Sequence, residues 1–253
     1  MDEQKKIKIL NVLDALLSGD NEPDKFSEEY LDSKIKEITM LPGCNLEPEE
    51  FEEIRKTLHH KYSIIMNDGW VISEDSDFED WYSNGPLTDS YWGRYKQYLS
   101  TDLGFSRYVV DAIDNSTTSI VNLLGDPKKN ISFAKKGLVI GDVQSGKTAN
   151  YISVINKAAD AGYKVIVLLT GTIEKLRKQT QARVDEGFIG DNTSDLERNA
   201  GRRSLIGVGR KDSSRNAVAL TSTIKDFNKT TLINSNIRLD SISSPLILVV
   251  KKN

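Results

Sequence analysis

One eight-residue segment, residues 141–148, constrains the fold of this chain more than any other feature of its sequence. The segment reads Gly-Asp-Val-Gln-Ser-Gly-Lys-Thr and matches the pattern G-x-x-x-x-G-K-S/T at every fixed position. A short apolar run, 137–140, precedes it, and apolar residues at helical spacing follow it. A glycine-rich turn between a strand and a helix is the setting in which this pattern forms a phosphate-binding loop. The alternative is a structural glycine turn followed by an exposed lysine.

The residue types in this segment have physical reasons for their positions. Glycines let the backbone curl so that successive N–H groups converge on phosphate oxygens, and the dipole of the following helix adds positive potential. Lys147 is expected to reach the β and γ phosphates of ATP, and the Thr148 hydroxyl to coordinate Mg²⁺. These two are the predicted catalytic residues. The full set predicted to bind the nucleotide is Gly141, Val143, Gln144, Ser145, Gly146, Lys147, Thr148 and Ala149.

Residues 130–253 have the sequence pattern of an α/β domain. Short runs rich in β-branched residues alternate with helical stretches, a pattern typical of parallel strands joined by crossover helices. The helices are expected at 147–161 and 173–186, and the strands at 137–140, 165–169, 204–208, 217–221 and 246–250. We therefore predict a mostly parallel sheet in this part of the chain.

Residues 1–125 have helical spacing throughout. Apolar residues recur every three to four positions, which predicts amphipathic helices. The helices are expected at 7–16, 26–38, 51–65, 91–99 and 108–124. The turn residues Gly125-Asp126-Pro127 end the pattern. We therefore predict an all-α N-terminal domain, 1–125, followed by the α/β domain, 130–253.

Charge is divided unevenly between these two parts. The whole chain of 253 residues carries 34 basic and 37 acidic side chains, and this balance argues by itself against a nucleic-acid partner. Residues 1–130 hold 14 basic and 26 acidic side chains, whereas residues 131–253 hold 20 basic and 11 acidic ones. An acidic helical part thus precedes a basic part, and the basic part suits ATP and the backbone of DNA.

Cysteine content and hydropathy indicate a cytoplasmic protein. The single cysteine, Cys44, cannot form an internal disulfide, and the N-terminus lacks the apolar segment that a signal peptide needs. The longest apolar runs have the length of a strand, so we predict no membrane span and no membrane partner.

Hydrolysis of ATP needs an acidic residue in addition to the phosphate loop. This residue holds Mg²⁺ and normally ends a neighbouring apolar strand. The predicted strands at 165–169, 217–221 and 246–250 lead into threonine, serine or lysine instead. We therefore expect the acid beyond Asn253, in a longer protein of which this chain is the N-terminal fragment. The fragment is expected to bind ATP without efficient hydrolysis.

Three sequence segments together carry a resemblance to a known family. They are Val143-Gln144-Ser145-Gly146-Lys147-Thr148-Ala149-Asn150-Tyr151, Leu169-Thr170-Gly171-Thr172 and Leu176-Arg177-Lys178-Gln179-Thr180-Gln181. With them, residues 91–253 resemble the Z-one domain family of large bacterial helicase-like ATPases and endonucleases. Genes of this family lie in restriction and anti-phage loci, often beside a histidine-kinase-type ATPase of the MORC kind.

The resemblance implies more than the loop does. It implies a superfamily-two helicase-like motor with two RecA-like P-loop NTPase lobes, of which residues 130–253 form an incomplete first lobe. It also implies DNA as the polymer, a hydrolase activity linked to nuclease action, and a role in antiviral or restriction defence. A partner ATPase of the MORC type is implied as well.

In helicase-like lobes, the segment after the second strand contacts the nucleic-acid backbone. Hydroxyls, backbone N–H groups and cations near a helix N-terminus suit phosphate oxygens. The corresponding residues here are Thr170, Thr172, Lys175, Arg177 and Lys178. The alternative is a solvated helix face on which the cations pair with neighbouring carboxylates.

Two rival functions remain open. The first is a nucleotide-dependent switch that docks a partner ATPase without moving along DNA. The second makes the acidic helical domain the functional part, as a docking surface. Metal-dependent hydrolysis by the histidines is not favoured, because His59 and His60 are adjacent and would point about 100° apart on a helix.

Overall fold

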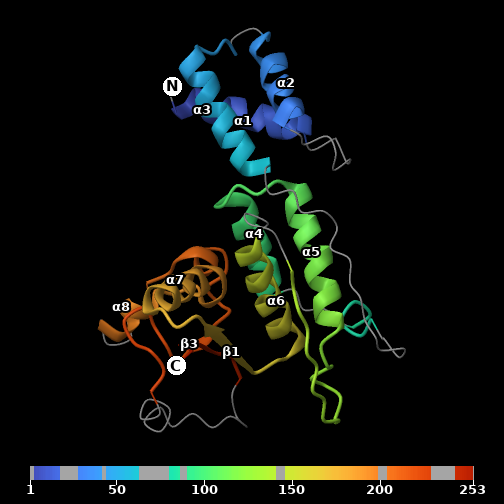
Figure 1. Ribbon diagram of the computed structural model, residues 1–253, viewed down its shortest axis with the longest axis vertical. Helices are drawn as coiled ribbons and strands as arrows, with labels where there is room; N and C mark the ends of the chain where they lie inside the picture. Colours follow the sequence, from blue (N-terminus) through green and yellow to red (C-terminus); the bar gives the residue numbers. More distant parts are fainter. Residues whose placement is uncertain are drawn as a thin grey trace.

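The computed structural model describes residues 3–17, 28–41, 44–62, 80–85, 90–140, 146–198, 204–228 and 243–252. They form a mixed α/β structure with a small parallel sheet (Figure 1). The helices are α1 (Glu3–Leu17), α2 (Glu28–Thr39), α3 (Pro48–Tyr62), α4 (Ser90–Thr101), α5 (Arg107–Asn122), α6 (Lys147–Ala161), α7 (Glu174–Val184) and α8 (Thr193–Arg198). The strands are β1 (Val165–Thr170), β2 (Val218–Ala219) and β3 (Leu246–Lys251). A π-helical turn, η2 (Asp185–Ile189), follows α7, and η3 (Gly207–Arg210) is a 3-10 turn.

Helices α1, α2 and α3 pack around a core of their own at one end of the molecule (Figure 1). Apolar residues at helical spacing face inward, which confirms three of the predicted amphipathic helices. The buried side chains are Ile9, Leu13, Leu17, Leu31, Ile35, Ile38, Ile54 and Leu58. On the outside, Lys5 Nζ lies 2.8 Å from a carboxylate oxygen of Glu50 and joins α1 to α3.

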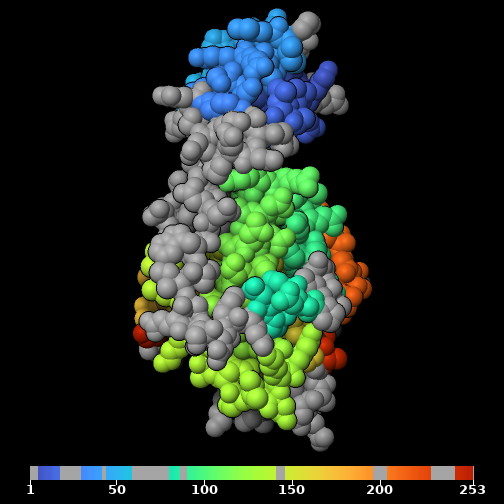
Figure 2. Space-filling model, turned by 90° about the vertical axis from the view of Figure 1, so that its right-hand side faces the viewer, coloured from blue at the N-terminus to red at the C-terminus, as the bar shows by residue number. Residues whose placement is uncertain are grey.

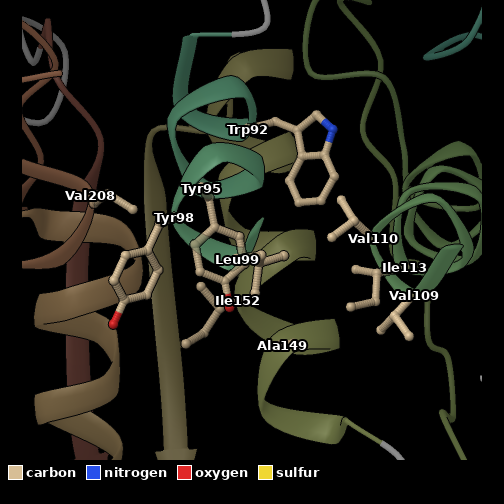
Figure 3. Packing of buried hydrophobic residues seen from close by; sticks show 10 residues of the cluster. All are labelled: Trp92, Tyr95, Tyr98, Leu99, Val109, Val110, Ile113, Ala149, Ile152 and Val208. Atoms are coloured by element: carbon tan, nitrogen blue, oxygen red, sulfur yellow. The ribbon is translucent and has the colours of Figure 1, made fainter. Parts of the chain in front are cut away.

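Helices α4, α5 and α6 share a second core, which Figure 3 shows from close by. Its buried members are Trp92, Tyr95, Tyr98, Leu99, Val109, Val110, Ile113, Ala149, Ile152 and Val208. This core crosses the division predicted between residues 125 and 130, because α4 and α5 precede that division and α6 follows it. The helices are grouped by the apolar faces that they bury against one another, and the Gly125-Asp126-Pro127 turn lies inside one packed unit.

A buried lysine joins these three helices. Lys157 of α6 has a side chain that is 1% exposed, and its Nζ donates hydrogen bonds of 2.6 Å to the carboxylate and the carbonyl of Asp114 and to the Thr118 hydroxyl. The same Nζ lies 4.8 Å from the centre of the Trp92 ring. Burial raises the pKa of Asp114, but Lys157, together with Lys96, brings it below its usual value. The carboxylate therefore stays charged beside the ammonium group.

Two polar contacts attach α4 to the rest of the α/β part. The carboxylate of Asp160 in α6 accepts hydrogen bonds of 3.1, 2.9 and 2.8 Å from the backbone N–H groups of Ser90, Tyr91 and Trp92. A negative charge is favourable at this end of a helix. Further along α4, the buried guanidinium of Arg94 donates to the carbonyls of Phe188, Asp212 and Arg215.

The sheet has the strand order β1-β3-β2, and both pairings are parallel. The register pairs Val165 with Leu246 and Thr170 with Lys251. Strand β3 lies in the middle and is buried over its first four residues, as a continuous apolar run predicts. The predicted parallel sheet and the strands at 165–169 and 246–250 are confirmed. The strand predicted at 217–221 is shorter, and the one predicted at 204–208 is an isolated bridge followed by η3.

The prediction of a strand at 137–140 is wrong. Residues 132–140 belong to no strand, and the side chains of Leu138, Val139 and Ile140 are 84%, 61% and 87% exposed. Figure 2 shows residues of this stretch on the surface below α5. Strand formation depends more on packing against neighbours than on intrinsic propensity, and these side chains find no such packing here.

We predict that Lys157→Met lowers the free energy of unfolding by about 3 kcal/mol, because Asp114 loses the buried partner of its charge. Equilibrium unfolding in urea would measure this loss. The matched control is Lys96→Met, which removes the more exposed partner of the same carboxylate and should cost less than about 1 kcal/mol. Equal losses in the two variants would contradict the role given to Lys157.

Candidate phosphate-binding site

The N-terminus of α6 is the part of the motif that the structure describes. Gly146 has φ of 69°, a left-handed conformation that favours glycine, and α6 begins at the next residue, Lys147. Since glycine has no side chain, the N-cap residue supplies no side-chain hydrogen bond to the first turn of α6. Lys147 is exposed, and Thr148 follows it. The predicted residues Gly141, Val143, Gln144 and Ser145 lie outside the described residues.

This helix end is held firmly by the core. The side chain of Ala149 is buried in the cluster shared with α4 and α5, and the same is true of Ile152. The buried amide of Asn156 donates to the carbonyl of Gly187 in η2 at 3.0 Å. Ala149 was predicted to contact the nucleotide, and the structure places its side chain in the core, so only its backbone could do so.

An arginine that sequence reasoning missed lies at the same helix end. Arg183, in the last turn of α7, donates through a terminal nitrogen to the Thr148 hydroxyl oxygen at 2.9 Å. Tyr151, one turn further along α6, is their neighbour. Burial raises the pKa of Tyr151, and the charge of Arg183 and hydrogen bonds with Arg183 and Thr148 lower it in part. Nothing in the sequence marks Arg183 as a residue of the site, because an arginine in the last turn of a helix is common.

The chemistry of this helix end fits a phosphorylated ligand with a bound cation. Two cationic side chains, Lys147 and Arg183, accompany the backbone N–H groups, and both suit phosphate oxygens. The Thr148 hydroxyl is an oxygen ligand of the kind that Mg²⁺ takes. In the part of the chain that the structure describes, His, Cys, Asp and Glu form no cluster of three that could hold a metal.

Arg177 is one of the residues predicted to contact nucleic acid, and the structure buries it. Its guanidinium is fully buried, and it pairs with the Glu174 carboxylate through Nε at 3.0 and 3.1 Å and through a terminal nitrogen at 2.8 Å. The other terminal nitrogen donates to the Ser222 carbonyl at 2.9 Å. An arginine bound in this way fixes α7 to the segment after β2 and is not available to a polymer.

The other residues predicted to contact nucleic acid have different surroundings. Thr170 donates its hydroxyl proton to the Val250 carbonyl at 3.1 Å, at the end of the sheet. Thr172, Lys175 and Lys178 are exposed after β1 and on α7. The structure therefore keeps these three side chains available to solvent and to a partner.

The expected magnesium-binding acid is not found after the described strands. Residues 171–173 follow β1, residues 220–222 follow β2, and Lys252 follows β3, and no acid is among them.

A buried polar network fixes the end of α7 that carries Arg183. The carboxylate of Asp185 accepts hydrogen bonds from the Gln181 amide at 2.8 Å and from the Thr193 hydroxyl at 2.7 Å. The Thr221 hydroxyl donates to Gln181 at 2.7 Å and accepts from the N–H of Val249 in β3 at 2.8 Å. The network therefore connects the last turn of α7 to the middle strand of the sheet.

Comparisons with known proteins add no identification. No protein-family model, no curated protein and no solved structure matches the chain. Among the described helices, none combines the length and the apolar character that a membrane span needs.

We predict that Asp185 makes the free energy of unfolding fall as the pH rises from about 4 to 6. Burial raises the pKa of this carboxyl from 3.8 to about 6, so the folded state keeps a proton that the unfolded state has released. The stabilising contribution is fully present below the unfolded-state pKa and is lost by about pH 6, a change on the order of 3 kcal/mol. Urea unfolding between pH 4 and 8 should show this decline in the wild type but not in Asp185→Asn. Parallel curves would contradict the assignment.

Proposed function

We propose that this chain binds ATP with Mg²⁺ at the N-terminus of α6. The observation that carries the proposal is the left-handed Gly146 directly before α6, followed by Lys147 and Thr148 in the order of the phosphate-loop pattern. Lys147 binds the β and γ phosphates, and the Thr148 hydroxyl helps to hold Mg²⁺. When bound, Mg²⁺ neutralises phosphate charge. The protein itself binds and orients the triphosphate with its N–H groups and cations.

The larger assignment is a RecA-like P-loop NTPase lobe of a helicase-like, DNA-dependent ATPase in bacterial anti-phage or restriction defence. Parallel pairing of β1 with β3, and α6 leading into β1, support an α/β lobe of this kind. The exposed Thr172, Lys175 and Lys178 supply the surface for a DNA backbone. A link to endonuclease activity rests on the resemblance of residues 91–253 to the Z-one domain family.

A second function is favoured by the burial of Arg177. With this arginine bound to Glu174 and Ser222, the surface after β1 has fewer cations for DNA than its sequence suggests. A nucleotide-dependent switch that docks a partner ATPase of the MORC type needs no such surface. Its nucleotide-bound state would differ from its free state in its contacts with that partner.

Calorimetry of Lys147→Ala tests nucleotide binding. The variant should show no Mg-ATP binding at concentrations that saturate the wild-type chain, because the cation that faces the β and γ phosphates is removed. Lys175→Ala removes an exposed lysine elsewhere in the same part of the chain and serves as the control. Equal affinities of wild type and Lys147→Ala would contradict the site.

Fluorescence anisotropy with a labelled oligonucleotide separates the two functions. If the lobe binds DNA, the double variant Lys175→Glu and Lys178→Glu should bind at least about tenfold more weakly at low salt. The slope of its log affinity against log salt concentration should fall by the amount expected for about two phosphate contacts. The control with the same change of charge is Lys135→Glu with Lys136→Glu, two exposed lysines before the motif. Unchanged binding in the first variant would contradict a DNA contact by α7 and favour the switch.

A further inference from the structure

Arg183 differs from the other arginines that connect elements of this part of the chain. Arg177 is buried against a carboxylate, and Arg94 is buried against three carbonyls. The guanidinium of Arg183 is exposed and contacts Thr148 and Tyr151. Within the described ranges it forms no ion pair with a carboxylate, so its charge is not neutralised there.

The atom that Arg183 contacts is the one that matters most for a metal. Arg183 donates to the Thr148 hydroxyl oxygen at 2.9 Å, and the proposed function gives the same oxygen to Mg²⁺. A guanidinium and a divalent cation on one oxygen repel each other. Simultaneous occupation is therefore unfavourable unless phosphate oxygens lie between them.

Arg183 is also suited to phosphate itself. A guanidinium carries five N–H donors in a planar fork that matches phosphate oxygens, and one donor is used by Thr148. Its attachment through the last turn of α7 is fixed, because Asp185 and Gln181 bind that turn to the sheet.

We propose that Arg183 is a second phosphate-binding cation of this site, which takes the place of Mg²⁺ on the Thr148 hydroxyl until the metal binds. The inference rests on the proposed function, since it needs the phosphates of a nucleotide at α6. Arg183 then lets the site bind metal-free ATP, and it sets how strongly binding depends on Mg²⁺. When Mg²⁺ is present, the guanidinium moves from Thr148 to phosphate.

Calorimetric titration of ATP into the full chain, once in EDTA and once in Mg²⁺, tests this inference. Arg183→Gln should bind ATP at least about tenfold more weakly than wild type in EDTA and by a clearly smaller factor in Mg²⁺. The gain in affinity on adding Mg²⁺ is therefore larger in the variant than in the wild type. Arg183→Lys should recover part of the affinity in EDTA, because it restores the charge without the fork.

The control is Lys164→Gln, which removes an exposed cation just after the C-terminal end of α6 and should leave both affinities unchanged. The competition with Mg²⁺ is refuted if Arg183→Gln changes the affinity for ATP by the same factor in EDTA and in Mg²⁺. If this outcome is found while the wild type binds ATP and Lys147→Ala does not, only the inference about Arg183 is refuted. If wild type and Lys147→Ala bind equally, the nucleotide site and the inference both fail.

Discussion

The buried ion pair between Lys157 and Asp114 is the interaction on which the rest of the α/β part depends. It is made in the middle of α6, and it brings together α5, through Asp114 and Thr118, and α4, through the Trp92 ring. Burying an ammonium group costs free energy unless the group is paired with a carboxylate and hydrogen bonded, and Lys157 is both. The position of α6 is therefore strongly specified, and α6 carries both the motif and the connection to β1.

Because α6 is fixed in this way, the positions of its two ends are fixed as well. At the C-terminal end, Asp160 caps α4, so the aromatic helix is aligned with α6 as well as packed on it. At the N-terminal end, Gly146 turns the chain and presents the first N–H groups together with Lys147. Arg183 reaches the same point from α7, whose last turn is bound to β3 through Asp185, Gln181 and Thr221. Both described elements of the candidate site, α6 and the last turn of α7, are thus tied to the core.

Local signals predicted the elements that carry the site. Glycines with positive φ stand on both sides of α6, Gly146 at 69° and Gly162 at 110°, and the helix has the bounds that the sequence predicts. Strands β1 and β3 were predictable from runs of β-branched residues. The run 137–140 has the same composition and forms no strand, because its side chains lie on the surface and not against a neighbour.

Two arginines of α7 show that the sequence alone does not predict which face of a helix is buried. Arg177 and Arg183 are six residues apart in α7, which turns them about 120° from each other. One is buried against Glu174 and Ser222, and the other reaches Thr148. Helical spacing separates their faces, but only the packing of α7 on η2 and the sheet decides which face is buried. The predicted nucleic-acid contact thus includes an arginine that the structure buries, and Arg183, which contacts Thr148, was not predicted.

We propose that phosphate binds at the N-terminus of α6, and amide chemical shifts of the ¹⁵N-labelled chain during titration with Mg-ATP would measure this binding. We predict that the largest shifts belong to residues 141–148, Gly146, Lys147 and Thr148 among them, since their N–H groups would gain charged acceptors. Saturating shifts confined to other parts of the chain, or no shifts at all, would contradict the claim.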